Sequence, residues 1–192
     1  MKLIFVILKY LIFTSYVEKL GLGRADWPKT STWAKTEPYS HHEHKTVLQF
    51  YFHEIAIGNS STVALIAQAQ PVDPNNSFAF GNLYMVDELL TVGPDPKSKF
   101  IGRAQGFSGS ASQQGVNSFM GLCYSFIDGI YNGSSINILG RNSILNPIRE
   151  IPVVGGTGLF RMARGYAIAQ TYYFNVTSGI VVVGYNVTVV HQ

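Results

Sequence analysis

The chain has 192 residues, a formal net charge of +3 and only 13% charged residues, which is about half the usual charged share. It contains no run of Lys and Arg, so nucleic acid is excluded as a partner. The length favours one domain. A domain of this size buries about 70% of the surface of its unfolded chain, so it needs neither a disulfide nor a metal to fold, and its one cysteine, Cys123, is expected to be a buried thiol.

The N-terminal segment is typical of a secretory signal peptide. One early Lys precedes an apolar stretch that ends near Tyr16, and Lys9 interrupts it. We expect residues 1–25 to be removed by cleavage between Tyr16 and Ala25. The apolar stretch is too short to span a membrane comfortably, although a retained anchor is the alternative. The sequence therefore predicts a protein of the extracellular space, with no membrane partner.

Five sites fit the acceptor pattern for N-linked glycans: Asn59, Asn75, Asn132, Asn175 and Asn186. One such site occurs easily by chance, but five behind a signal peptide together support a secreted glycoprotein.

Residues 26–45 are expected to form a flexible arm, because they are rich in Pro, Ser and Thr and lack a strand pattern. The arm ends in the cluster His41-His42-Glu43-His44. Adjacent side chains in an extended segment point apart, so a solvated linker is favoured over a metal site. His53-Glu54 begins like a zinc H-E-x-x-H motif, but the fifth position is Ile57. We therefore expect no metal.

From residue 46 the chain consists of strand-like runs separated by Gly, Pro and Asn turns. The runs are 46–56, 62–70, 81–92, 100–110, 119–127, 136–141, 150–154, 159–173 and 179–191. No long segment has helical periodicity, so residues 46–192 are predicted to be an all-β sandwich or up-and-down barrel. Eight strands would close a barrel that can hold one small ligand.

Strand alternation predicts which side chains face inward. In the last run Val181, Val183, Tyr185, Val187 and Val189 share the apolar face, which places Asn186 outside. In the first run the inner face carries Leu48, Phe50, Phe52 and Glu54. A carboxyl group among aromatic residues has a raised pKa, as a general acid or base requires. The alternative is a residue of the rim that contacts water or an arginine.

The segment Arg149–Gly165 contains Gly-Gly-Thr-Gly after an apolar run. A dinucleotide-binding loop needs G-x-G-x-x-G, and the third glycine would fall at Arg161. The residues that follow alternate with period two, so we predict a tight turn followed by a strand over 159–173.

Several motifs agree in order with one protein family. They are Phe50-Tyr51-Phe52-His53-Glu54-Ile55, Val86-Asp87-Glu88, Gly102-Arg103-Ala104-Gln105-Gly106, Tyr131-Asn132-Gly133-Ser134, Gly140-Arg141-Asn142 and the Arg149–Gly165 segment. Together, from Thr46 to His191, they resemble the dirigent proteins of plants. The resemblance implies an all-β fold: an eight-stranded antiparallel up-and-down barrel like that of allene oxide cyclase. It also implies trimers, although the sequence itself leaves a dimer or a trimer open.

The resemblance also implies a chemistry. Dirigent proteins impose stereoselectivity on the coupling of phenoxy radicals, such as those of coniferyl alcohol, in the apoplast. A separate laccase or peroxidase supplies the oxidation, and the chain itself is expected to need no cofactor. Glu54 matches the acid that acts on a quinone methide, although the family usually has Asp, and Arg149 matches a pocket arginine. Asn142 stands where some members carry a second acid, which weakens the case for pinoresinol formation.

We therefore expect Glu54 and Arg149 to be catalytic. The expected substrate-binding residues are Phe50, Phe52, Asp87, Glu88, Phe107 and Asn142. Two alternatives stay open: an isoflavanol dehydratase similar to pterocarpan synthase, and a non-catalytic barrel that binds a hydrophobic ligand or serves in cell-wall defence.

Overall fold

The computed structural model describes residues 43–69 and 79–192. Their structure consists almost entirely of strands, together with two short 3-10 helices, η1 (Gly129–Tyr131) and η2 (Gly158–Phe160). The strands are β1 (His44–Ile55), β2 (Val63–Ala67), β3 (Leu83–Thr91), β4 (Phe100–Ser110), β5 (Asn117–Phe126), β6 (Ser135–Ser143), β7 (Arg149–Thr157), β8 (Arg164–Asn175) and β9 (Ile180–His191).

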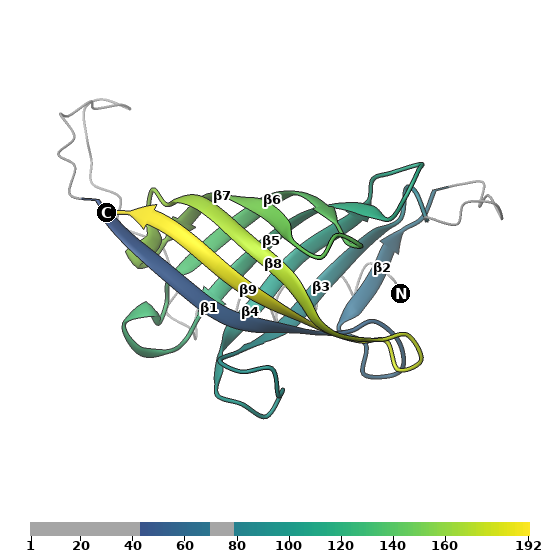
Figure 1. Cartoon of the computed structure of the whole chain (residues 1–192), viewed down its shortest axis with the longest axis horizontal. Helices are drawn as coiled ribbons and strands as arrows, with labels where there is room; N and C mark the ends of the chain where they lie inside the picture. The colour runs from purple at the N-terminus through teal and green to yellow at the C-terminus, as the bar shows by residue number, and fades with distance from the viewer. Residues whose placement is uncertain (1–42, 70–78) are drawn as a thin grey trace, which may run out of the picture. The chain divides into compact units, whose positions relative to one another are not determined.

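The strands close into an antiparallel barrel (Figure 1). Each strand from β3 to β9 pairs with the next along the chain, β9 pairs with β1, and β1 returns to β3. Eight strands thus form the closed barrel, and β2 adds a ninth strand on β3. The predicted eight-stranded up-and-down barrel is confirmed.

Strands β1 and β2 divide one edge of β3 between them. Residues 51–53 of β1 pair with residues 89–91 of β3, whereas residues 63–65 of β2 pair with residues 84–86. Thr62 lies at the division: its amide donates to the Ile55 carbonyl at 2.9 Å, and its carbonyl accepts from the Asp87 amide at 3.1 Å. The seam between β1 and β3 therefore opens just beyond His53.

A buried polar contact stabilises the closed part of this seam. His53 Nε2 lies 2.6 Å from Thr91 Oγ1, and the Thr91 hydroxyl donates to the Gly93 carbonyl at 2.7 Å. Because the hydroxyl hydrogen is used on Gly93, the imidazole must be the donor to Thr91. The contact links β1 to the turn that follows β3.

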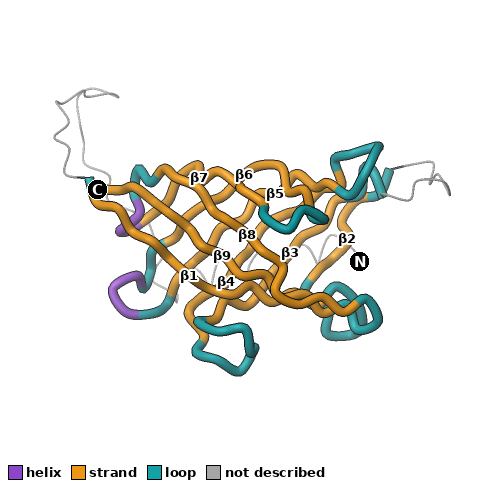
Figure 2. The backbone as a smooth tube through the Cα atoms, in the orientation of Figure 1, coloured by secondary structure: helices purple, strands orange, loops and turns teal. Residues whose placement is uncertain are grey.

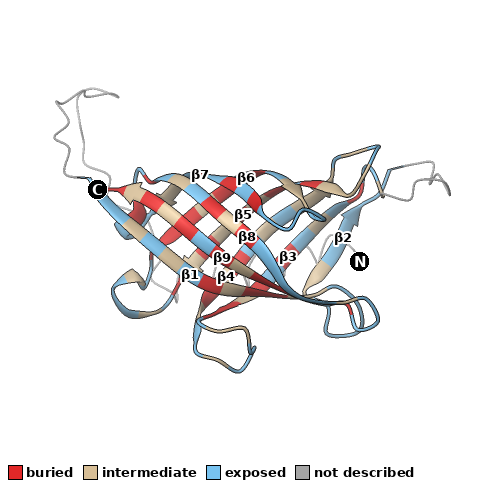
Figure 3. Cartoon of the chain, viewed as in Figure 1, coloured by how far each residue is buried: buried red, intermediate tan, exposed pale blue. Residues whose placement is uncertain are grey.

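Burial alternates along the strands as the sequence predicts (Figure 3). On β9, Val183, Tyr185, Val187 and Val189 are buried, and Asn186 between them is exposed. On β1, Phe50 and Phe52 belong to the core cluster, and Leu48 packs against it. One outward position departs from the pattern: Val182, expected to be free, is only 5% exposed.

Aromatic residues fill one half of the barrel interior. The Phe50 ring lies 5.2 Å from that of Tyr124 and 5.7 Å from that of Tyr185. Further along, Phe126 and Phe160 meet edge to face at 5.9 Å. These contacts leave the other half of the interior for the cavity described below.

The predicted strand 159–173 is wrong in its first five residues. Residues 158–160 form η2, and the strand begins at Arg164 (Figure 2). Gly158 has φ +62°, and a Cβ there would lie 2.6 Å from Ser134 Oγ, so this tight turn needs glycine. The turn carries Phe160 into the core, where it is fully buried. The period-two alternation could not show that Phe160 lies in a turn before the strand, with its ring packed in the core at the end of the barrel.

Residues 1–42, which include the predicted signal peptide and nearly all of the predicted arm, lie outside the described residues, as does Asn75. The first strand starts at His44, two residues before the predicted domain boundary. In the part of the chain that the structure describes, no helix is long and apolar enough to cross a membrane.

The inward and outward faces of β9 can be tested with one pair of variants. Val187→Asp buries an unpaired charge in a fully enclosed position and should cost several kcal/mol of unfolding free energy. Thr188→Asp, on the partly exposed outer face, should cost about 0.5 kcal/mol. Urea unfolding followed by circular dichroism measures both, and equal losses would contradict the assigned orientation.

Candidate functional site

A cavity of about 250 Å³ occupies the half of the barrel that the aromatic cluster leaves empty. Leu145 and Phe174 are exposed at its rim, so the mouth opens to solvent at this end. Seven of the eight barrel strands and the β6–β7 loop contribute to the lining. The lining residues are Phe52, Glu54, Val86, Ser108, Ser118, Met120, Leu122, Asn142, Ile144, Leu145, Phe174, Val181, Val183 and Tyr185.

Glu54 is the one carboxyl group in this lining. It lies on the inner face of β1, two residues after Phe52, because both side chains share the parity of the core residue Phe50. Burial raises the pKa of the Glu54 carboxyl. A group with this shift can hold a proton at a pH at which an exposed glutamate has lost it, and can therefore serve as acid or base.

Glu88 is a second buried acid, on β3. It is fully enclosed, and neither carboxyl oxygen has a hydrogen-bond partner among the described residues. Burial raises its pKa to about 8, although the nearby Thr62 hydroxyl opposes this shift. That hydroxyl is close to the Ile55 carbonyl, at 3.4 Å. Glu88 does not line the cavity, so the structure does not place it against a ligand.

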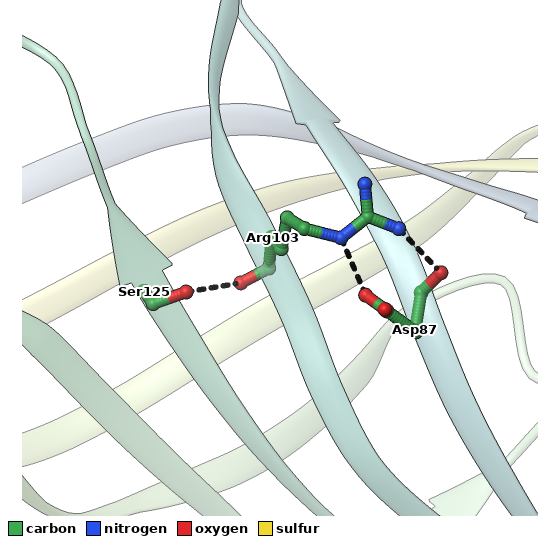
Figure 4. Close-up of polar contacts among 3 residues, drawn as sticks. All are labelled: Asp87, Arg103 and Ser125. Atoms are coloured by element: carbon green, nitrogen blue, oxygen red, sulfur yellow. Dashed lines mark hydrogen bonds and ion pairs between the residues drawn. The ribbon is translucent and has the colours of Figure 1, made fainter. Parts of the chain in front are cut away.

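Asp87, adjacent to Glu88, points to the outside of the barrel. The Arg103 guanidinium on β4 donates to the Asp87 carboxylate and to its backbone carbonyl, the latter at 2.9 Å (Figure 4). On the other side, the Ser125 hydroxyl donates to the Arg103 carbonyl at 3.3 Å. Asp87 and Arg103 thus form an ion pair on the outer face, and Asp87 is absent from the cavity lining.

Arg149 is buried at the start of β7, on the face that points inward. Its terminal nitrogen donates to Thr171 Oγ1 at 3.0 Å, whereas the buried Nε has no partner among the described residues. The guanidinium lowers the pKa of Tyr124 and of Tyr185, against the larger rise that burial causes. Arg149 is absent from the cavity lining, but its positive charge acts on Tyr185, which does line the cavity.

Asn142, on β6, lines the cavity. Its amide nitrogen lies 3.5 Å from Met120 Sδ, and its buried carbonyl oxygen has no partner among the described residues. An unpaired amide oxygen next to a cavity can accept a hydrogen bond from a phenolic hydroxyl. It cannot exchange a proton as an acid would.

Four of the six predicted substrate-binding residues lie outside the cavity lining. Two of them are the acids Asp87 and Glu88 described above. Phe50 lies in the aromatic cluster, and Phe107 points outward and is 37% exposed. The inner side of β4 carries Ala104, which is fully buried, and Ser108, which lines the cavity. Of the predicted set, Phe52 and Asn142 line the cavity.

Tyr185 is the site residue that the sequence reasoning missed. Its ring lines the cavity, and both Glu54 and Arg149 affect the pKa of its hydroxyl. Between Val181 and Val189 it is the one residue with a polar group on the inner face, among four valines. This contrast between one tyrosine and the surrounding valines is the sequence feature that could have identified Tyr185 as a site residue.

The described glycan acceptors lie away from the cavity lining. Asn59, Asn132 and Asn186 are exposed, and Asn175 is half-buried. The side-chain oxygen Oδ1 of Asn175 accepts from the backbone amides of Thr177 and Ser178, both at 3.0 Å. Within residues 43–69 and 79–192, no three His, Cys, Asp or Glu side chains are grouped to hold a metal ion.

Comparison with known proteins identifies the family. The sequence profile described as "Dirigent-like protein" matches residues 45–190. The chain belongs to this family. It is 45% identical to Dirigent protein 23 of Arabidopsis thaliana, over 87% of this chain and 89% of that protein. It is also 42% identical to Pterocarpan synthase 1 of Glycyrrhiza echinata, over 76% of this chain and 78% of the relative.

Solved structures of dirigent proteins have the same barrel. The pterocarpan synthase dirigent protein GePTS1 superposes with a TM-score of 0.73 at 41% identity, over 81% of this chain and 89% of that one. A pyocyanin demethylase reaches a TM-score of 0.51 at 12% identity, a likeness of fold alone.

The pH dependence of stability tests the enclosed position of Glu88. In the folded state its pKa is about 8 against an ordinary 4.5, so the unfolded chain releases the proton first as pH rises. The wild-type protein should therefore lose stability between pH 4.5 and 8, by roughly 1 kcal/mol per pH unit. Glu88→Gln removes this loss, so the variant should gain about 2 kcal/mol on wild type between pH 5 and 7.

Urea unfolding at several pH values measures this difference. Glu150→Gln, at an exposed position of β7, is the matched control and should follow the wild-type curve. Parallel curves for Glu88→Gln and wild type would contradict the raised pKa.

Proposed function

We propose that this dirigent-family protein binds one phenolic molecule in its cavity and directs the stereochemistry of a reaction that passes through a phenoxy radical or a quinone methide. The observation that carries the proposal is Glu54, a carboxyl group in a cavity whose other lining residues are uncharged. A charged carboxylate there is costly, so its proton is available to an oxygen of the ligand.

Each part of the site has a role in this proposal. Glu54 gives a proton to the quinone methide oxygen, or takes one from the attacking hydroxyl group. Asn142 and Tyr185 orient the ligand by hydrogen bonds, and Phe52 packs against its ring. Arg149 stabilises negative charge that develops on the ligand from behind the cavity wall. An external laccase or peroxidase generates the radicals when the reaction is a coupling.

A second candidate is the dehydration of an isoflavanol, which needs no oxidant. One observation that favours it is the likeness to pterocarpan synthases in sequence and structure. The other is the size of the cavity: its volume of about 250 Å³ is just below the range of roughly 300–1,000 Å³ for small-molecule pockets. That volume suits one phenolic molecule better than two radicals side by side. Glu54 would then protonate the leaving hydroxyl group, which departs as water.

One comparison separates the candidates. A panel of phenols with laccase, and of isoflavanols without it, is incubated with and without the protein, and the products are resolved by chiral chromatography. An excess of one enantiomer that needs laccase supports coupling, and a pterocarpan formed without oxidant supports dehydration. Binding of the ligands with neither product would instead support a carrier or cell-wall defence role.

Glu54→Gln tests the mechanism directly. The amide keeps the shape and polarity of the side chain, so fold and ligand affinity should be preserved. The rate should fall by a factor of about 10² to 10⁴, and in a coupling reaction the enantiomeric excess should be lost. Ligand binding is measured by calorimetry and product by chiral chromatography. Glu150→Gln should behave as wild type. Unchanged product in Glu54→Gln would leave shape alone as the source of selectivity.

We also propose that the protein is secreted to the apoplast as a glycoprotein, on the basis of the signal-like N-terminus and the exposed acceptors Asn59, Asn132 and Asn186. Expressed in leaves, it should be recovered in apoplastic fluid, without residues 1–25, and should shift in size after glycosidase treatment. Changing these three asparagines to Gln should remove most of that shift. Recovery in the cytosol with an intact Met1 would contradict the proposal.

The outer face of the barrel supports association into a homo-oligomer. Met85 and Phe107 lie directly opposite each other on β3 and β4, and Phe119 and Leu139 lie on β5 and β6. All four are between 37% and 46% exposed, and an apolar patch of this kind is typical of a protein interface. We propose that copies of the chain, as a dimer or trimer, cover it.

A further inference from the structure

The enclosed carboxyl group of Glu88 is poorly compensated: the nearby Thr62 hydroxyl favours its charged form, but within the described residues neither oxygen makes a well-formed hydrogen bond. It is fully buried. Arg103, the cation whose charge acts on it, is bound to Asp87 on the outer face. A buried polar group without a partner costs stability, so its placement suggests a role in function.

The register of the barrel seam brings Glu88 beside Glu54. On β1 and β3, Phe52 pairs with Leu90 and His53 with Leu89. Glu54 and Glu88 are the residues next to this last pair, at the level where the seam opens, and each shares the inward parity of the paired residues Phe52 and Leu90. Both therefore point to the interior, where Glu54 faces the cavity and Glu88 lies behind it.

We propose that Glu54 and Glu88 form a carboxyl pair that holds one proton and one negative charge at neutral pH. Glu54 faces the ligand, and Glu88 is the positioning residue that sets the protonation state of Glu54. The inference rests on the proposed role of Glu54 as acid or base. The proton moves from the Glu88 carboxylic acid to the Glu54 carboxylate, which leaves Glu88 ionised and Glu54 protonated, and the net charge of the pair does not change.

The groups around Glu88 are compatible with a retained proton. Burial is the largest cause of its raised pKa, and the negative charges of Glu54 and Asp87 raise it further. The Thr62 hydroxyl and the Arg103 guanidinium lower it. Two carboxyl groups whose charges interact in a poorly solvated interior do not readily ionise at the same time, so they titrate as a pair.

Such a pair gives the cavity an acid and a base at once. After Glu54 donates its proton to a ligand oxygen, Glu88 can restore it without access to solvent. The carboxylate that remains can take the next proton, from a phenolic hydroxyl group. A lone glutamate could do either step but would need water to reset between them.

The test uses the free protein, so it does not depend on a substrate. Glutamate labelled with ¹³C at the side-chain carboxyl carbon is incorporated into wild type, Glu54→Gln, Glu88→Gln and Glu150→Gln, and the carboxyl signals are followed by NMR from pH 4 to 9. In wild type two carbons should sense one step near pH 8. That step should vanish in Glu88→Gln. In Glu54→Gln, the Glu88 signal should titrate about one pH unit lower, and Glu150→Gln should match wild type.

The pair is overturned if Glu88 titrates in the range of an exposed glutamate, or if the Glu54 signal is unaffected by the step near pH 8. Wild type alone decides the second point, even if a variant does not fold. In turnover assays, the loss of activity at high pH should move to lower pH in Glu88→Gln. A confirmed pair with full activity in Glu54→Gln would refute the proposed function and not the pair.

Discussion

The return of β1 to β3 is the contact on which the site depends. β1 pairs with β9 along its whole length, but with β3 over three residues only. Beyond them Thr62 enters the seam and β2 takes over the edge of β3. Closure removes the free edges of the sheet. Glu54 and Glu88 flank the last paired residues of the two strands, at the level where closure ends.

The interior is divided by side-chain size. Large rings from β1, β5 and β9 meet in one half, where Phe50, Tyr124 and Tyr185 are in contact. The neighbouring strand β4 contributes small residues such as Ala104, which pairs with Tyr124, and at Gly106 a Cβ would lie 2.1 Å from the Gly121 carbonyl of β5. The glycines of the Gly102–Gly106 motif therefore allow the two strands to approach closely, and small residues on β4 leave room for the rings of β5.

Much of this could be predicted from the sequence. Nine apolar runs with turn residues between them predicted nine strands, and period-two alternation correctly placed Phe52 and Glu54 inside and Asn186 outside, because parity is a local property of a strand. The family motifs then supplied the closure and the strand number. The start of β8 was missed, since the turn at Gly158 depends on Phe160 finding its place in a distant part of the core.

The composition of the site was harder to predict than the fold. Phe107 was assigned to the pocket because it is aromatic, yet on β4 the inner face is the less apolar one, so hydrophobicity indicated the wrong side. An inner residue lines the cavity or packs in the core according to its position along the barrel axis. This position is set by the register between strands. Tyr185, at the border between the two halves, is identified only once the register is known.

The aromatic cluster also gives the cavity a floor. A ligand must therefore arrive and depart through the same mouth, past Leu145 and Phe174, and turnover cannot proceed by flow through the barrel. Any part of the ligand that extends beyond the mouth of the cavity remains in solvent. Groups at that outer end, including a sugar, should be tolerated, whereas the ring that reaches Glu54 is selected by the fit at the floor.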